Sequence, residues 1–199
     1  MIDAKKFEKD LAEYFEKISF VARDMQGSVE KIAKMAILLE EAAEKGHNIY
    51  IMGNGGSAST ASHMASDLNK TAIAQGRKRF KAICLNDNIP VMLAWANDNS
   101  FDLIFVEQLK NFLSEGDIVI GISGSGNSPN VIKAIEYANQ EGNMTIGITG
   151  MINPNGGKLG TIAKLPIIVP DNLMYRLEDF HLMINHALIF ALKHSAEKE

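Results

Sequence analysis

Short apolar runs alternate with helical patterns along most of this chain, and this alternation restricts the folds open to it. Each run ends in or just before a small or polar residue: 48–52, 80–85, 118–122, 145–148 and 165–169. None shows polar–apolar alternation, as expected for parallel strands buried on both faces. Helical periodicity fills the intervals: 60–69, 89–96, 101–113, 129–140 and 173–193. The order predicts a doubly wound α/β fold with a parallel sheet.

The N-terminal part has a different pattern. Apolar residues recur at helical spacing from Ala4 to Lys45, with a break near Met25–Ser28 where Ser28 can cap a second helix. With 199 residues the chain suits one domain. We therefore expect a single domain, 1–199, with a helical pair at 1–45 and an α/β core at 46–199. The apolar faces of the pair exceed what a small sheet covers, so the first helix is expected to pack on a partner subunit.

Composition excludes several classes of function. The formal net charge is −4, and Lys and Arg are scattered, so nucleic acid is not the expected partner. The single cysteine, Cys84, lies in an apolar run and is expected to be buried and inert. The charged start and the lack of an apolar stretch of about 20 residues predict a cytoplasmic chain that does not enter a membrane.

Two glycine–serine loops, Gly53–Ser59 and Ser123–Ser128, follow the first and third predicted strands and precede helices. Ligands of open α/β sheets bind at such strand ends. Glycine lets the backbone approach an anion, and helix N-termini and hydroxyl groups favour negative charge. We expect the phosphate-binding residues to be Asn54, Gly55, Gly56, Ser57, Ser123, Gly124, Ser125 and Ser128.

A single loop of this kind can also be an ordinary strand–helix turn, but two of them, both rich in serine, favour a binding site. The chain lacks the GxxxxGK[ST] pattern of nucleoside triphosphate loops, and Ser59 replaces the third glycine of a dinucleotide motif. Asp87 is therefore a poor candidate for a ribose-binding acid. Neither loop contains Lys or Arg. Backbone amides and hydroxyls alone suit a monophosphate ester.

Together with the N-terminal helices, these loops make the chain resemble the sugar isomerase (SIS) domain family and, within it, the phosphoheptose isomerases. The resemblance also rests on the pair Asn97-Asp98 and on a last helix that carries Arg176, His181 and His186. It implies a five-stranded parallel sheet and a homotetramer with active sites between subunits. It further implies aldose–ketose interconversion of a sugar phosphate, commonly with zinc, and a substrate site that includes Asn97, Asp98 and Glu178.

The resemblance also assigns four polar residues. The isomerases carry His and then Glu four residues later after the first loop, and Gln and then His eight residues later in the last helix. The matching positions here are His63, Asp67, Glu178 and His186. These are the expected zinc ligands. Asp67 replaces a glutamate, Glu178 a glutamine, and Gly124 a usual threonine, so substrate preference can differ.

Spacing supports a shared role, because His63 and Asp67 lie on one helical face and Glu178 and His186 lie two turns apart on nearly one face. The alternative is that His63 and Asp67 form a surface pair and that His181 and His186 are core histidines. Isomerisation through an enediol needs a base and an acid. We hypothesise Asp67 as base and His186 as its partner, with Glu178 as a second candidate carboxylate.

Two functions remain open from the sequence. The first is an isomerase that interconverts sedoheptulose 7-phosphate and a heptose 7-phosphate. The second is a non-catalytic SIS module that senses a phosphosugar or binds protein partners. The histidine at position 186 favours catalysis, whereas the replacements at Asp67 and Glu178 leave room for binding alone.

Overall fold

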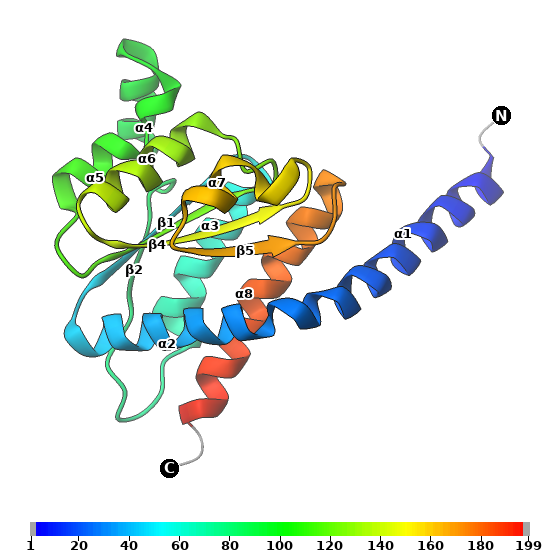
Figure 1. Cartoon of the computed structure of the whole chain (residues 1–199), viewed down its shortest axis with the longest axis horizontal. Helices are drawn as coiled ribbons and strands as arrows, with labels where there is room; N and C mark the ends of the chain where they lie inside the picture. The colour runs from blue at the N-terminus through cyan, green and yellow to red at the C-terminus, as the bar shows by residue number, and fades with distance from the viewer. Residues whose placement is uncertain (1–2, 197–199) are drawn as a thin grey trace.

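The structure is a computed structural model that describes residues 3–196. Its centre is a five-stranded parallel sheet in the order β2-β1-β3-β4-β5 (Figure 1). The strands are β1 Asn48–Gly53, β2 Lys81–Cys84, β3 Ile118–Ser123, β4 Met144–Gly150 and β5 Leu165–Val169. All five lie where the apolar runs predicted them. The chain leaves β1 towards β2 and returns on the other side of β1 as β3, so β1 and β3 flank the topological switch point.

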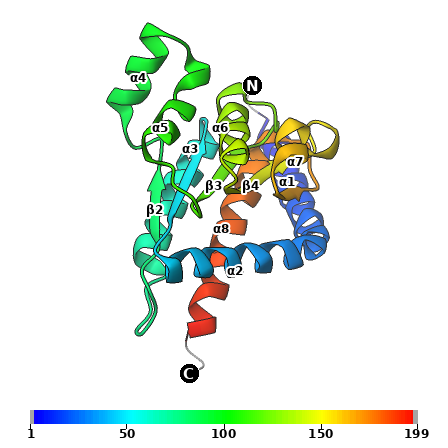
Figure 2. The same ribbon diagram turned by 60° about the vertical axis from the view of Figure 1, so that its left-hand side comes forward.

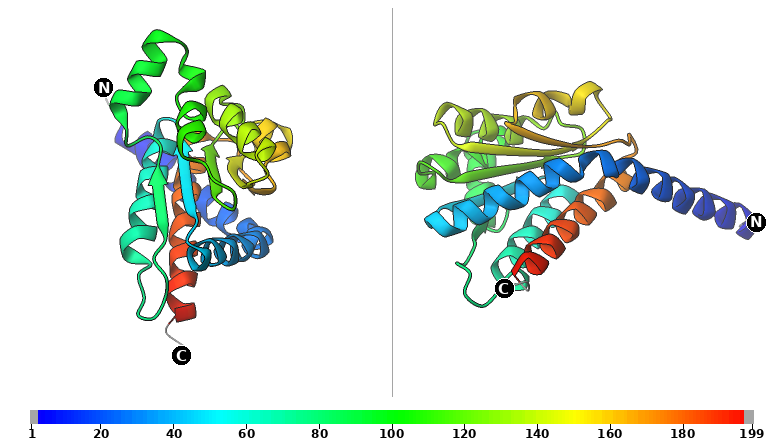
Figure 3. Two further views of the ribbon diagram at one scale, coloured as in Figure 1. Left: turned by 90° about the vertical axis from the view of Figure 1, so that its left-hand side faces the viewer. Right: turned by 60° about the horizontal axis from the view of Figure 1, so that its bottom comes forward.

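Helices cover both faces of the sheet, which explains the continuously apolar strands. One face packs on α2 Val29–Lys45, α3 Gly56–Ser66 and α8 Met174–Ala196. The other packs on α5 Val106–Phe112, α6 Pro129–Gln140 and α7 Gly157–Ile162. Side chains alternate between these layers: Ile49 and Ile51 belong to the first core, and Tyr50 and Met52 to the second. Figure 3 shows the two helical layers on opposite sides of the sheet.

The N-terminal helices are separated at the predicted break. Helix α1 spans Ala4–Asp24, and the 3-10 turn η1, Met25–Ser28, leads into α2. Only Val21 of α1 is buried. The N-terminal half of α1 extends away from the body, with Phe7, Leu11 and Phe15 exposed by 59%, 58% and 68% (Figures 1 and 3). One long helix thus carries an apolar stripe that the chain itself does not cover.

Helix α4, Ile89–Asp98, is also weakly packed. It is strongly apolar, yet none of its residues is buried, and it stands beyond the body of the domain (Figure 2). The predicted helix over 101–113 is instead the 3-10 turn η3, Phe101–Leu103, followed by α5. Ser100 has an extended backbone, and its hydroxyl accepts a hydrogen bond from the N–H of Asp102, which starts a separate turn.

Two further segments differ from the sequence-based expectation. Helix α3 starts at Gly56 rather than Thr60 and continues into a π-helical turn, η2 Asp67–Thr71. The interval between β4 and β5, for which no helix was predicted, contains the 3-10 turn η4, Pro154–Gly156, which leads directly into α7. Helix α7 is short and is held by a tertiary hydrogen bond from the N–H of Leu159 to the carbonyl of Gly126, which no local pattern encodes.

Cys84 is buried, as expected, and burial raises the pKa of its thiol to about 12. The thiol therefore stays protonated at physiological pH. Within residues 3–196, no helix combines the length and the apolar character needed to cross a membrane.

Candidate active site

The two glycine–serine loops meet at the carboxyl edge of the sheet, beside β1 and β3. Together they line one cavity of about 240 Å³, which we call the cradle. Its lining residues are Asn54, Gly55, Gly56, Ser57, Ile122, Ser123, Gly124, Ser125, Ser128, Met174 and Glu178. All eight residues predicted to bind phosphate thus line a single cavity. Gly55 has φ 54° and ψ −124°, a backbone conformation that glycine adopts without strain.

The polar groups of the cradle suit an anion. Ser57 lies in the first turn of α3, and Ser128 is the N-cap of α6, so both helix N-termini point their dipoles at the cavity. The hydroxyl groups of Ser123 and Ser128 lie 2.9 Å apart. Ser125 Oγ accepts a hydrogen bond from the N–H of Asn127 at 3.2 Å. No lysine or arginine lines the cradle, so its donors are neutral.

The two loops are braced against each other. The side-chain amides of Asn54 and Asn130 exchange two hydrogen bonds of 2.9 Å. The second loop is also locked to η4: Gly126 has φ +66°, and a Cβ there would lie 1.8 Å from the carbonyl oxygen of Gly156. Close backbone packing therefore requires glycine at this position.

Glu178 brings a carboxylate into the cradle. It projects from the second turn of α8 and lies against Gly56, where a Cβ would come within 2.3–2.5 Å of its carboxyl atoms. Among residues 3–196, no hydrogen bond or ion pair engages this carboxylate. The cradle thus joins neutral anion donors to one acidic group.

A second group of polar residues lies farther along α3 and α8. One donor atom from each of His63, Asp67 and His186 lies within 4.8 Å of the other two, and we call these residues the histidine–aspartate cluster. The Nε2 atoms of His63 and His186 are 3.4 Å apart, and Nε2 of His63 is 3.3 Å from Oδ2 of Asp67. The His63 side chain is 44% exposed, whereas that of Asp67 is only 14% exposed.

Both oxygens of Asp67 are engaged. Thr71 Oγ1 donates to Oδ1 at 3.0 Å, and Asn185 Nδ2 donates to Oδ2 at 2.8 Å. Neither partner is among the catalytic, substrate-binding or zinc-binding residues expected from the sequence. Asn185 lies directly before His186, but its contact with Asp67 depends on how α3 and α8 pack.

Not all expected site residues come together. Glu178 is absent from the cluster, and its eight-residue separation from His186 corresponds to about 12 Å along α8. The expected set of four zinc ligands is therefore not assembled within one chain. Asn97 and Asp98 lie at the end of α4, bonded to each other at 2.7 Å, and do not line the cradle.

Arg176 and His181, the other two residues of α8 on which the resemblance rests, have structural roles in this chain. Arg176 pairs with Asp171, with Nη2 2.8 Å from Oδ1. His181 is completely buried, and burial lowers the pKa of its imidazole to about 4. His181 is therefore neutral at physiological pH and fits the core-histidine interpretation.

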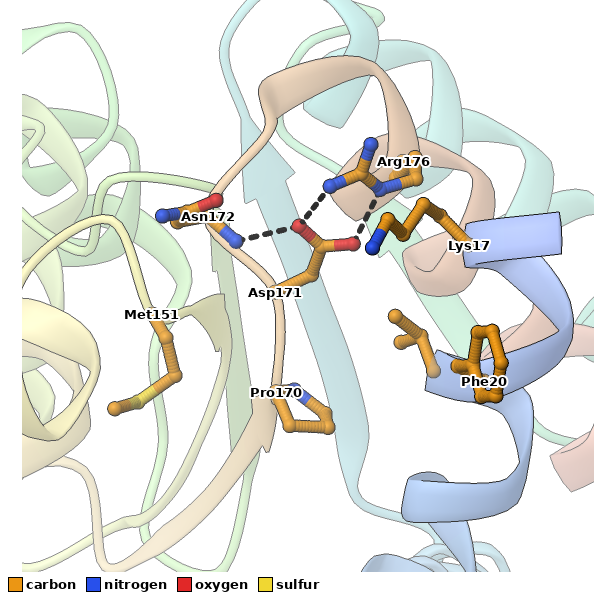
Figure 4. A pocket seen from close by; sticks show the side chains of 8 residues that line it. Lys17, Phe20, Met151, Pro170, Asp171, Asn172 and Arg176 are labelled. Atoms are coloured by element: carbon orange, nitrogen blue, oxygen red, sulfur yellow. Dashed lines mark hydrogen bonds and ion pairs between the residues drawn. The ribbon is translucent and has the colours of Figure 1, made fainter. Parts of the chain in front are cut away.

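A larger cavity of about 490 Å³, which the sequence did not reveal, lies between α1 and the loop from β5 to α8 (Figure 4). Lys17 and Phe20 line it from α1, and Met151 lines it from the opposite side. Asp171 is its buried acid. Although burial disfavours the charged form, hydrogen bonds from Arg176 and from two backbone N–H groups hold the pKa of Asp171 below its ordinary value. The bonded carboxylate anchors the start of α8.

Comparison with known proteins assigns the class. The family model described as SIS domain matches residues 13–150, and the chain belongs to the SIS domain family. The family and the fold expected from the two loops are confirmed.

Within the family, the chain is similar to phosphoheptose isomerases. It is 35% identical to the enzyme of Aliarcobacter butzleri over 180 residues, covering 90% of this chain and 92% of the relative. It is also 35% identical to that of Aquifex aeolicus over 184 residues, covering 92% and 91%. The solved phosphoheptose isomerase from Neisseria gonorrhoeae superposes with a TM-score of 0.85 at 27% identity, covering 94% of this chain and 99% of that one.

Proposed function

We propose that the chain is a sugar-phosphate aldose–ketose isomerase that interconverts sedoheptulose 7-phosphate and a heptose 7-phosphate. The name shared by its relatives, phosphoheptose isomerase, supports this activity. The observation that carries the proposal is the presence, in one domain, of a lysine-free anion cradle and a histidine–aspartate cluster. The cradle supplies binding, and the cluster supplies the ionisable groups.

The cradle would hold the phosphate ester. Backbone N–H groups at the start of α3 and the hydroxyls of Ser123, Ser125 and Ser128 are the donors. A monophosphate needs no cationic side chain there, because helix dipoles and several hydrogen bonds share its charge.

Proton transfer requires a group with an available lone pair. Both oxygens of Asp67 are held by hydrogen bonds and Oδ2 also faces His63, so Asp67 is better placed as a metal ligand than as the base expected from the sequence. Glu178 has no hydrogen-bond or ion-pair partner within residues 3–196 and lies in the cradle, and we assign it as base. Its carboxylate takes the proton from the carbon beside the carbonyl, and the C–H electron pair forms the C=C bond of the enediol. The carbonyl electron pair moves onto the carbonyl oxygen, which takes up the hydroxyl proton with Nδ1 of His186 as partner, since Nε2 of this residue faces the metal position. Glu178 then returns its proton to the former carbonyl carbon.

The cluster fits a zinc ion. Two imidazoles and one carboxylate, with donor atoms within 4.8 Å of one another, match the three protein ligands typical of catalytic zinc sites. His63, Asp67 and His186 would hold the ion. When bound, zinc would supply Lewis-acid polarisation of a carbonyl oxygen.

The site would be completed between copies of this chain. Glu178 and His186 are about 12 Å apart along α8, too far to act on one pair of carbons from the same helix. A second copy that places its cradle against this cluster would bring the two groups together. The exposed stripe Phe7, Leu11 and Phe15 on α1, and the uncovered helix α4, offer apolar surfaces for such contacts. We propose a homotetramer on this basis.

One assay tests the activity. Metal-loaded and chelator-treated protein would be incubated with sugar phosphates of five to seven carbons, and aldose–ketose exchange would be followed by NMR. We expect exchange with sedoheptulose 7-phosphate. No exchange with any sugar phosphate, combined with retained binding of one, would favour the non-catalytic SIS module instead.

A mixing experiment tests the shared site. A Ser125→Ala/Ser128→Ala variant disables the cradle, and a His186→Ala variant disables the cluster. If each site combines groups from two copies, unfolding and refolding the two variants together would restore part of the activity that each lacks. Failure of mixed oligomers to regain any activity would contradict sharing between copies.

A further inference from the structure

Asn185 is an unusual residue at its position in α8. It is fully buried beside apolar residues such as Ile184 and Leu188, and the other buried polar residue nearby on the helix is His181, one turn earlier. Its Nδ2 donates to Asp67, whereas its Oδ1 has no hydrogen-bond partner within the described part of the chain. A buried carbonyl without a partner is destabilising by about 1–3 kcal/mol. The polar side chain therefore calls for a reason other than stability.

The orientation of this amide follows from chemistry. An ionised carboxylate only accepts hydrogen bonds, so the NH2 group of Asn185 must face Asp67. The reversed amide would place two oxygens against each other. In this orientation Oδ1 is turned away from Asp67, and no group within residues 3–196 donates a hydrogen bond to it.

Thr71 holds the other side of the carboxylate. Its hydroxyl donates to Oδ1, and both residues belong to the π-helical turn, in which the N–H of Ala72 bonds to the carbonyl of Asp67 at 2.8 Å. Local π-helical turns often occur at functional sites. With Thr71 and Asn185 in place, Oδ2 of Asp67 remains 3.3 Å from His63.

We propose that Asn185 and Thr71 are positioning residues that aim the short carboxylate of Asp67 at the metal position between His63 and His186. The inference rests on the metal site of the proposed function. An aspartate reaches about 1.5 Å less far than a glutamate, one C–C bond. Two fixed hydrogen bonds compensate by removing the freedom of the side chain to turn away. Partners behind a metal ligand typically contribute 10–100-fold to metal affinity.

Zinc affinity, measured by competition with a chromophoric chelator and without substrate, tests the proposal. Asn185→Leu should weaken zinc binding by about 10–100-fold, and its thermal midpoint should be retained or raised. Thr71→Val should weaken binding, whereas Thr71→Ser keeps the hydroxyl and should restore most of it.

Asn143→Leu is the matched control. Asn143 is also buried, and its Oδ1 has no partner within residues 3–196, but it lies immediately before β4, remote from the cluster. Its replacement should leave zinc affinity unchanged. Equal losses in Asn143→Leu and Asn185→Leu would overturn the positioning role and point to a general loss of packing.

A double-mutant cycle sharpens the test. Asp67→Glu lengthens the ligand, so a carboxylate that reaches the ion directly should depend less on Asn185. The loss of zinc affinity caused by Asn185→Leu should therefore be smaller in the Asp67→Glu background than in the parent. The absorption spectrum of Co²⁺ bound in place of zinc should likewise change less with Asn185→Leu in that background. Equal losses in both backgrounds would overturn the compensation.

Two further results would overturn the inference. One is a folded Asn185→Leu protein that binds zinc as tightly as the parent. The other is a parent protein that binds zinc no more tightly than His63→Ala. Both are read without sugar phosphate, so they are separate from the NMR exchange assay on which the isomerase activity depends.

Discussion

The cradle and the histidine–aspartate cluster use different parts of the chain for different tasks. The cradle lies at the carboxyl ends of β1 and β3 and is built mainly from backbone groups, glycines and hydroxyls. The cluster lies on α3, the π-helical turn η2 and α8 and is built entirely from ionisable side chains. The binding groups thus lie in the loops that connect strands to helices, and the reactive groups lie where two helical segments pack together.

The two regions also differ in how complete they are. The cradle is lined by residues of one chain and braced by the Asn54–Asn130 amide pair. The cluster faces outward, with His63 44% exposed. A single chain can therefore hold a phosphate, whereas the chemistry is expected to need an apposed surface. Variants that separate binding from turnover test this difference.

The largest effect is expected for His186→Ala. Loss of a group that takes part in proton transfer typically lowers the rate by about 10²–10⁴-fold. The dissociation constant for inorganic phosphate should stay within about twofold, because the cradle does not contain His186. Calorimetric titration and the NMR exchange assay would measure the two quantities. A parallel loss of phosphate binding would show that the two regions are not separate.

A buried imidazole should govern acid sensitivity. The pKa of His181 is about 4 in the folded protein and near 6.5 when unfolded, so the unfolded state binds more protons between these values. Stability should therefore fall as the pH drops from 6.5 to 4, by up to about 3 kcal/mol from this residue. Urea unfolding at pH 7.5 and 4.5 should show that the free energy of unfolding depends less on pH in His181→Leu than in the parent protein. An unchanged slope would assign the effect to other groups.

A smaller effect is expected in the cradle. Ser128→Ala removes one hydroxyl, and a hydrogen bond to a charged group contributes about 1.5–3 kcal/mol. Phosphate affinity and KM for the sugar phosphate should worsen by roughly 10–100-fold, with kcat much less changed. Ser114→Ala, at a serine outside the cradle, is the control. A fall in kcat alone would place Ser128 in the chemical step.

The smallest effect is expected for Glu178→Gln on phosphate binding. Replacing the carboxylate by an amide removes a negative charge beside the anion, so inorganic phosphate should bind a few times more tightly at low salt and less so at high salt. Isomerase activity should fall in the same variant. Glu30→Gln, at an exposed position on α2, should change neither property. Weaker phosphate binding in Glu178→Gln would contradict the placement of this carboxylate against the cradle.

The two glycine–serine loops show how far local sequence can be interpreted. Both were predicted at strand ends with the residues that line the cradle. The helix after the first loop was expected to start at Thr60, but it starts at Gly56 because glycine and serine can occupy a first turn whose N–H groups face an anion site. The attachment of the second loop to η4 and α7 was missed, since Gly126 and Gly156 are 30 residues apart.

The contacts of the polar residues also divide into those that local spacing predicts and those that depend on tertiary packing. The spacing of His63 and Asp67 predicted their contact, because positions four apart on a helix are neighbours. The contact of both with His186, and the hydrogen bond from Asn185 to Asp67, depend on the packing of α3 against α8. Glu178 and His186 had been expected to share a site because they lie on nearly one face of the helix, but the rise of eight residues places them about 12 Å apart along α8.

The sequence by itself determined the parallel sheet, the two anion loops and the family, because apolar runs, glycines and serines act through local backbone geometry. Only the tertiary structure decided that Glu178 lies over the cradle and that Asn185 and Thr71 hold Asp67. Side chains from distant segments meet according to how the helices pack on the sheet, and that packing is a property of the whole core rather than of any one segment.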